Sequence, residues 1–194
     1  VLLGKGTGAF EQAKTLNVGT EPVAVRIADL NKDSKWDLVV ANAYSGSISV
    51  LIGNGDGTFK DAANTPISGS PSSLAVSDFT GDGKDDVAVG TSDSGTVVIL
   101  PGKGDGSFDA MALKTTTGLG RPMALWSGDL NGDMKADIAL ANFNGRAGVV
   151  LLGKGDGTFQ APRSHPAGSG PMSVTPTGVN RDTNEPIANL GAAR

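Results

Sequence analysis

The sequence contains no cysteine, which excludes disulfides, thiolate metal sites and cysteine nucleophiles. Histidine occurs once, at His165, so metal sites built from several histidines are excluded too. No apolar run approaches the roughly 20 residues of a membrane-spanning helix, which argues against membrane insertion. Basic residues are outnumbered, with a formal net charge of −4, so a nucleic-acid partner is not expected.

Glycine and proline are abundant instead, with 29 and 10 copies among 194 residues. This composition predicts many turns and little helix. The chain begins with Val1 rather than methionine. That start is compatible with removal of a signal segment or with excision from a longer chain.

A glycine-rich motif recurs four times along the chain. It reads GKGTGAF (4–10), GNGDGTF (53–59), GKGDGSF (102–108) and GKGDGTF (153–159), at spacings of 49, 49 and 51 residues. Each copy is typical of a hairpin turn, and its phenylalanine is expected to plug the interface between neighbouring repeats. A period near 50 residues with short strands indicates one propeller blade per repeat.

Four short strands are predicted in each repeat. In the second repeat they fall at 72–79, 86–92, 95–102 and 108–116, each β-rich or alternating and bounded by glycine, aspartate or proline. No window has a convincing helical period. The sequence therefore predicts an all-β fold, a β-propeller of four-stranded repeats of about 49 residues.

The order of the strands predicts a single domain spanning 1–194. Whole blades are expected at 21–69, 70–120 and 121–170, and a closing blade split between 1–20 and 171–194. Such a four-bladed ring would hide both sheet edges. Two alternatives stay open: a homodimer in which two chains form an eight-bladed ring, and a fragment of a longer propeller.

Oxygen-bearing side chains recur just before the second strand of three repeats. Counted from the first aspartate, they occupy positions 1, 3, 5 and 9 of each loop, while position 7 is always a lysine that can offer only its carbonyl oxygen. Alternating oxygen ligands on a tight loop suit a hard cation. The predicted ligands are Asp29, Asn31, Asp33, Lys35 and Asp37; Asp78, Thr80, Asp82, Lys84 and Asp86; and Asp129, Asn131, Asp133, Lys135 and Asp137.

Calcium is the predicted ion, about three per chain. The loop closes at position 9 with aspartate, so it is no EF-hand, and magnesium prefers a water-rich octahedron. Turn chemistry alone is the simpler alternative, but repeated carboxylates would repel one another without a cation. Gly83 stands at the sharp position 6, where Ser34 and Met134 are expected to be strained. The fourth loop has lost its anchors at Gly178 and Pro186 and is expected to hold no ion.

DLNGDMKADIALAN (129–142) followed by LLGKGDGTF (151–159) resembles the FG-GAP/VCBS repeat of integrin-like β-propellers. The resemblance covers nearly the whole chain. It implies calcium in the Asp-rich loops and an extracellular or cell-surface role in adhesion, carbohydrate binding or scaffolding. Two departures are evident, because integrin-type rings have about seven blades and the fourth loop here is degraded.

The expected function is a secreted binding or adhesion module for a glycan or a protein. The turns between second and third strands vary among the repeats, and variable loops on a rigid frame often carry recognition. Their ligand-binding candidates are Tyr44, Asp93, Phe143 and Arg146. A purely structural scaffold is one alternative. A calcium-assisted lyase or lactonase is the enzymatic alternative, and it lacks a recognisable catalytic group.

Overall fold

The computed structural model describes residues 1–109 and 114–175, and throughout these residues the secondary structure is β. No helix in this part of the chain could span a membrane. Twelve strands follow the predicted order. They are β1 (Pro22–Ala28), β2 (Asp37–Asn42), β3 (Ser47–Leu51), β4 (Ala63–Pro66), β5 (Pro71–Ser77), β6 (Asp86–Thr91), β7 (Thr96–Leu100), β8 (Lys114–Thr116), β9 (Pro122–Gly128), β10 (Asp137–Asn142), β11 (Ala147–Leu151) and β12 (Arg163–Pro166).

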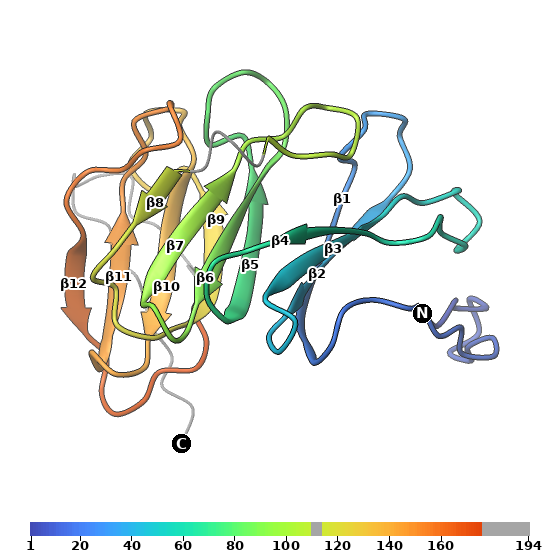
Figure 1. Cartoon of the computed structure of the whole chain (residues 1–194), viewed down its shortest axis with the longest axis horizontal. Coiled ribbons are helices and arrows are strands. Elements are labelled where there is room, and N and C mark those ends of the chain that lie inside the picture. The colour runs from blue at the N-terminus through green and yellow to red at the C-terminus, as the bar shows by residue number, and fades with distance from the viewer. Residues whose placement is uncertain (110–113, 176–194) are drawn as a thin grey trace.

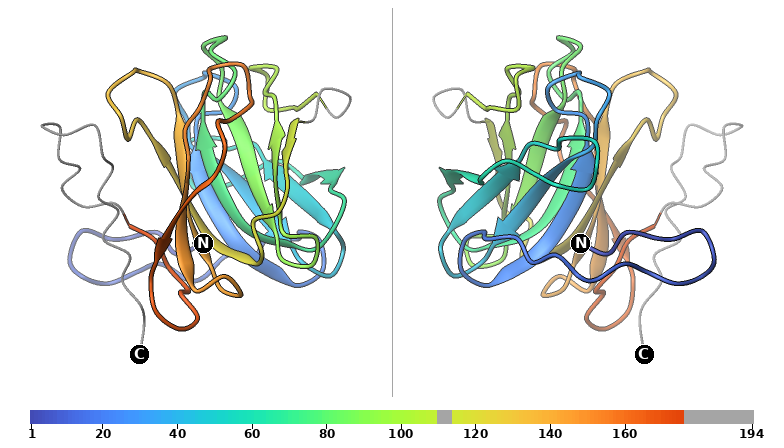
Figure 2. Two further views of the ribbon diagram at one scale, coloured as in Figure 1. Left: turned by 90° about the vertical axis from the view of Figure 1, so that its left-hand side faces the viewer. Right: turned by 90° about the vertical axis from the view of Figure 1, so that its right-hand side faces the viewer.

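The strands form three antiparallel four-stranded sheets, each ordered as in the sequence: β1–β4, β5–β8 and β9–β12. We call them the first, second and third sheets. They stand side by side like the blades of a propeller (Figures 1 and 2). The predicted all-β propeller architecture is confirmed. The predicted fourth strand of the second repeat is shortened to β8, and its residues 110–113 lie outside the described part.

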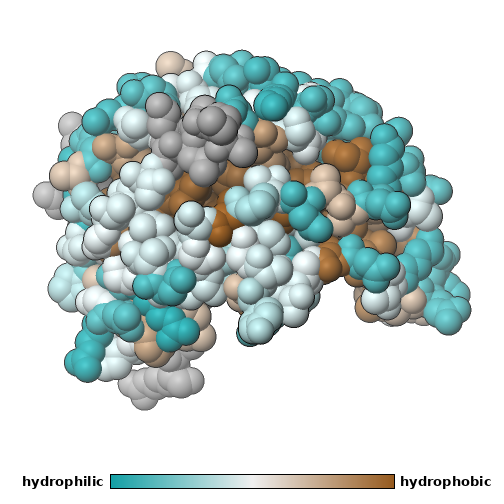
Figure 3. Space-filling model, in the orientation of Figure 1, coloured by the Kyte–Doolittle hydropathy of each residue, from teal (hydrophilic) through white to brown (hydrophobic). Residues whose placement is uncertain are grey.

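The sheets pack face to face through aliphatic side chains. One core lies between the first and second sheets and includes Val39, Ile48, Leu74 and Val89. Another lies between the second and third sheets. The central strands therefore bury both faces, which explains their continuous apolar runs in place of strict alternation. In the orientation of Figure 1, polar residues dominate the upper margin and apolar residues gather across the middle (Figure 3).

The innermost strands β1, β5 and β9 lie around a common axis. The Ser127 hydroxyl donates to the Val76 carbonyl at 3.0 Å, which joins β9 to β5. Arg26 on β1 reaches further and donates to the Leu125 carbonyl on β9 at 3.3 Å. These side-chain hydrogen bonds thus connect the inner strands of different sheets around the axis.

One face of β1 differs from its counterparts in the other sheets. Val25 is 51% exposed, whereas Leu74 and Leu125, at the same repeat position, are 0% and 3% exposed. Val23 and Ile27 on the same face are also exposed. The second and third sheets each bury this face on the preceding sheet. Among the described residues, the apolar face of β1 therefore lacks the cover that the equivalent faces of β5 and β9 have.

Residues 1–20 lie beside the first sheet, where the outer half of a preceding blade would be. The Gly19 N–H donates to the Ser49 hydroxyl, and a Cβ on Gly57 would meet the Leu3 side chain. At the other end of the row, Val174 is buried against the third sheet. In Figure 1 these two ends are far apart. Residues 176–194 of the predicted split blade lie outside the described part, so closure by that blade stays a prediction.

Candidate metal-binding loops and the groove between them

Each Asp-rich loop folds around the carboxylate at position 1. In the first loop Asp29 accepts the N–H groups of Asp33 at 3.0 Å and Ser34 at 2.8 Å. The Asn31 side-chain oxygen accepts the same Asp33 N–H at 3.1 Å. Because two side-chain oxygens meet at one backbone N–H, positions 1 and 3 lie on the same side of the loop.

The third loop repeats this geometry. Asp133 N–H is 3.2 Å from the Asp129 carboxylate and 3.0 Å from the Asn131 side-chain oxygen. Four loop N–H groups hold the pKa of Asp129 below its ordinary value, against an opposing effect of burial. The carboxylate is therefore ionised at neutral pH, as a cation ligand must be.

The carboxylate at position 9 is buried and begins the second strand of each sheet, as the sequence predicts. Asp37 is 0% exposed, and its two oxygens accept the N–H groups of Leu30 at 3.0 Å and Gly53 at 2.8 Å. It thereby joins the Asp-rich loop to the following glycine-rich turn. The equivalent residues are Asp86, which binds Phe79, Thr80 and Gly102, and Asp137, which binds Leu130 and Gly153.

Burial raises the pKa of Asp86 and of Asp137 above the ordinary carboxyl value, although backbone N–H donors oppose the shift. The charges of Asp133 and Asp129 raise the pKa of Asp137 further. A cation held by the loop would reduce this repulsion.

The lysines at position 7 pair with position 5 in two of the loops. The Lys35 ammonium lies 3.6 Å from Asp33 and that of Lys84 lies 3.0 Å from Asp82. The side chain and backbone N–H of Lys84 hold the pKa of Asp82 below its ordinary value. Part of the carboxylate charge is therefore already neutralised by the protein.

Position 6 takes the left-handed conformation in all three loops, as the sequence predicts. The φ angles are 64° at Ser34, 79° at Gly83 and 65° at Met134. Left-handed φ costs a non-glycine residue roughly 1–2 kcal/mol. The first and third loops are therefore more strained than the second.

Replacing Met134 by glycine is expected to stabilise the protein by about 0.5–1 kcal/mol, because the strain is relieved and the side chain is 93% exposed. Gly83→Ala should destabilise it by a similar amount, since a Cβ there would meet no other atom and only φ is penalised. Met134→Ala is the control, because it truncates the side chain and keeps the strain. Urea denaturation of the three variants measures these differences; equal stability of Met134→Gly and Met134→Ala would contradict the strain.

The donor set is that of a hard cation, although the carboxylates do not converge as a dense cluster. Among residues 1–109 and 114–175, no three acidic or histidine side chains form a group able to hold a metal ion. Position 9 lies inside and points its oxygens at backbone N–H groups. The side chains at positions 1, 3 and 5 carry oxygens of the kind that calcium takes, and an oxygen that accepts one amide bond keeps a further lone pair. The Thr80 hydroxyl, at position 3 of the second loop, is buried.

The ligand-binding candidates lie at the opposite end of the sheets, between second and third strands. Tyr44 is 80% exposed. Asp93 accepts the N–H groups of Ser70 at 2.8 Å and Ser94 at 2.7 Å, which gives it a structural role in its turn.

Phe143 lies under the Arg121 guanidinium, 5.5 Å from the ring centroid. The Arg146 N–H donates to the Phe143 carbonyl at 3.4 Å, and the Arg146 carbonyl accepts from Ala167. The exposed residues among the four candidates that the sequence predicts are thus Tyr44, Asp93 and Arg146.

The phenylalanines of the glycine-rich turns pack between sheets where a preceding sheet is present. Phe108 is 8% exposed in the first core, and Phe159 lies edge-on to Phe79 with centroids 6.1 Å apart. Phe10 is 61% exposed. Phe108 and Phe159 therefore pack at the interfaces between neighbouring sheets, as the sequence predicts.

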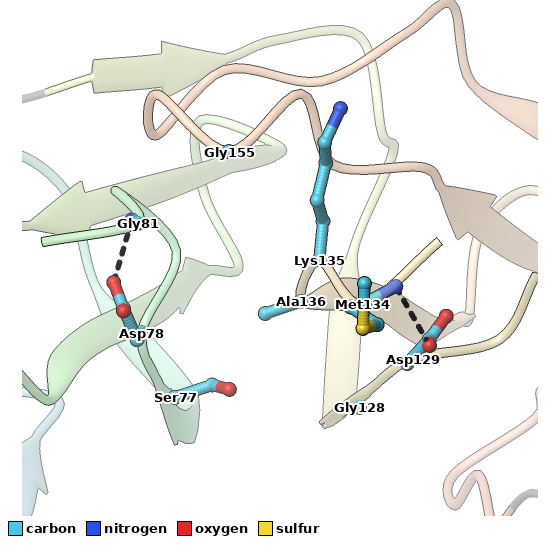
Figure 4. A pocket seen from close by; sticks show the side chains of 9 residues that line it. All are labelled: Ser77, Asp78, Gly81, Gly128, Asp129, Met134, Lys135, Ala136 and Gly155. Carbon is cyan, nitrogen blue, oxygen red and sulfur yellow. Dashed lines mark hydrogen bonds between the residues drawn. The ribbon is translucent and has the colours of Figure 1, made fainter. Parts of the chain in front are cut away.

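The structure also shows a hollow that the sequence analysis missed. It measures about 280 Å³ and lies between the second and third Asp-rich loops. Asp78 and Asp129 stand on opposite sides of it, and Lys135 also lines it, with its stem beside Gly155 (Figure 4). The sequence carried a signal for it, because position 4 is Lys32 in the first loop and Gly81 in the second.

Comparison with known families supports the repeat structure. The sequence matches the FG-GAP-like repeat over residues 29–89, 78–140 and 129–184. The chain belongs to the FG-GAP repeat family. All three matches begin at position 1 of an Asp-rich loop, and the first two reach the second strand of the next repeat, so the FG-GAP unit contains both the loop and the glycine-rich turn. No curated protein matches the sequence.

Solved structures share the fold. One is an Agrocybe aegerita lectin that recognises non-reducing terminal N-acetylglucosamine, with 20% identity, a TM-score of 0.54, and coverage of 84% of this chain and 45% of the lectin. Another is BBS1N in complex with ARL6DN, with 15% identity, a TM-score of 0.52, and coverage of 82% of this chain and 41% of that chain. The FG-GAP chain therefore spans less than half of either neighbour.

Proposed function

We propose that this FG-GAP chain is a calcium-binding β-propeller module that binds a glycan or a protein outside the cell. The observation that carries the proposal is a loop geometry that occurs three times. In each loop the position 1 carboxylate accepts hydrogen bonds from backbone N–H groups of the same loop. In the first and third loops the side-chain oxygens of positions 1 and 3 also converge on the N–H of position 5. Calcium at the millimolar level of extracellular fluids fills even weak loops of this kind.

Calcium would brace the blades on which the ligand-binding surface is built. Three ions would change the formal charge of the chain from −4 to +2. Each would also reduce the repulsion among three carboxylates. The ion thus stabilises the frame, and the recognition surface is a separate part of the molecule.

Tyr44 and its turn supply the first recognition surface to examine, because the side chain is exposed on the rigid β2–β3 hairpin. Tyrosine offers a large amphipathic contact at low entropic cost. A lectin of the same fold recognises terminal N-acetylglucosamine, so glycans with that terminus are natural first probes.

The test is binding of the labelled chain to immobilised glycans and to extracellular-matrix proteins, in calcium and in chelator. We expect calcium-dependent binding that Tyr44→Ala weakens by at least about tenfold, as for an aromatic anchor. Tyr44→Phe is the matched control, since it keeps the ring. Calcium-dependent stability without any ligand would instead identify a scaffold, and turnover of a uronate or lactone substrate would identify an enzyme.

A further inference from the structure

A lysine closes the junction between the first and second Asp-rich loops. Lys32, at position 4 of the first loop, donates its ammonium to the Gly83 carbonyl at position 6 of the second. Asp85, at position 8 of the second loop, interacts electrostatically with Lys32, Asp78 and Asp29. The ammonium of Lys32 is therefore bound by a carbonyl at a junction where negative charge prevails.

The junction between the second and third Asp-rich loops is built from the same repeat positions but has no lysine at position 4. Position 4 of the second loop is Gly81, and position 8 of the third loop is Ala136. Both line the hollow of about 280 Å³ between these loops. Met134 also lines it and holds the repeat position of Gly83. Asp78 and Asp129 line it as well, as the position 1 carboxylates of the two loops.

We propose that this hollow binds the ε-ammonium of a lysine from a partner protein, which lies there as Lys32 lies in the neighbouring junction. The Met134 carbonyl accepts the hydrogen bond from this ammonium, as the Gly83 carbonyl does from Lys32. Asp78 and Asp129, on opposite sides of the hollow, supply negative charge (Figure 4).

The size of the hollow favours a single side chain. Typical small-molecule pockets measure about 300–1,000 Å³, and this hollow is below that range. In the neighbouring junction a single slender lysine side chain, Lys32, brings its ammonium to the Gly83 carbonyl. Met134 and Ala136 supply apolar surface for such a stem, since lysine stems pack along apolar groups while the charge stays at polar ones.

The local charge favours a cation even with calcium bound. Residues 78–86 and 129–137 together carry a formal charge of −5, and two calcium ions would leave −1. Lys135 directs its stem past Gly155, toward the rim of the hollow. The inference deepens the proposed binding role and does not depend on calcium.

The experiment is a titration of the full chain followed by amide chemical shifts, with Nα-acetyl-lysine amide as the probe. Its Nε-acetylated form is the uncharged control, and glucosamine tests the other common source of a primary ammonium. We expect shifts of the Gly81, Met134 and Ala136 amides with the charged lysine alone. Equal shifts with the acetylated form, stronger shifts with glucosamine, or no shifts at these amides would overturn the inference.

Ala136→Asp copies Asp85 into the third loop and should tighten binding of the charged probe about tenfold, because it adds a carboxylate at the hollow. Ala136→Asn has nearly the same size as Ala136→Asp without the charge and should give no such gain in affinity. Equal affinities of the two variants would contradict the proposal. Repeating the titration in calcium and in chelator separates the two hypotheses, since lysine binding without any calcium response would overturn only the calcium proposal.

Discussion

Replacing Asp86 by alanine is expected to destabilise the protein by about 3–5 kcal/mol, because buried backbone N–H groups lose their acceptor. The carboxylate accepts from Phe79 and Thr80 at 2.9 Å each and from Gly102 at 2.8 Å. It is 0% exposed, so water cannot easily replace it. The same group joins two loops, and its loss should loosen both.

Urea denaturation in chelator measures this cost without a contribution from calcium. Asp82→Ala is the matched control, because Asp82 is in the same loop and forms an exposed pair with Lys84, worth at most about 1 kcal/mol. Asp86→Asn should be intermediate, since one oxygen still accepts. If Asp86→Ala costs no more than Asp82→Ala, the buried carboxylate does not brace the loops.

Leu74→Ala is expected to cost about 2–5 kcal/mol, the range for a leucine in a packed core. Leu74 is 0% exposed between the first and second sheets. Val25 holds the same repeat position in β1 and is 51% exposed, so Val25→Ala should cost less than about 1 kcal/mol. The pair compares one position of the repeat with and without a neighbouring blade.

The measurement is the free energy of unfolding of both variants over a range of protein concentrations. A small cost for Val25→Ala at every concentration agrees with an uncovered β1. A cost of about 2 kcal/mol or more would show that a blade covers β1 in solution, as ring closure requires. A cost that grows with concentration would assign that blade to a second chain.

The strands could be predicted because their signals are local. Apolar runs between aspartate and glycine marked β2, β6 and β10, and the fixed period placed each of them at an Asp-rich loop. Position 6 could be predicted for the same reason, since glycine at Gly83 showed which backbone angle the loop needs.

The partners of individual side chains could not be predicted, because they depend on how the sheets pack. The sequence predicts Asp37 as a metal ligand, which stays a prediction, but it did not reveal that the two oxygens accept the N–H groups of Leu30 and Gly53. The hollow beside Gly81 likewise depends on the distance between two loops in different sheets. The exposure of Val25 follows from the absence of a neighbouring sheet in the described part, which no local pattern reveals.

Calcium titration of chelator-treated protein, by calorimetry and thermal unfolding, tests directly whether the Asp-rich loops bind calcium. We expect three sites per chain and a rise in melting temperature, with about 2.7 kcal/mol of stabilisation per site at a hundredfold excess over Kd. Magnesium at equal concentration should give a much smaller rise. No binding heat and an unchanged melting temperature would contradict the account, and the Asp-rich loops would then be turns held by their own hydrogen bonds.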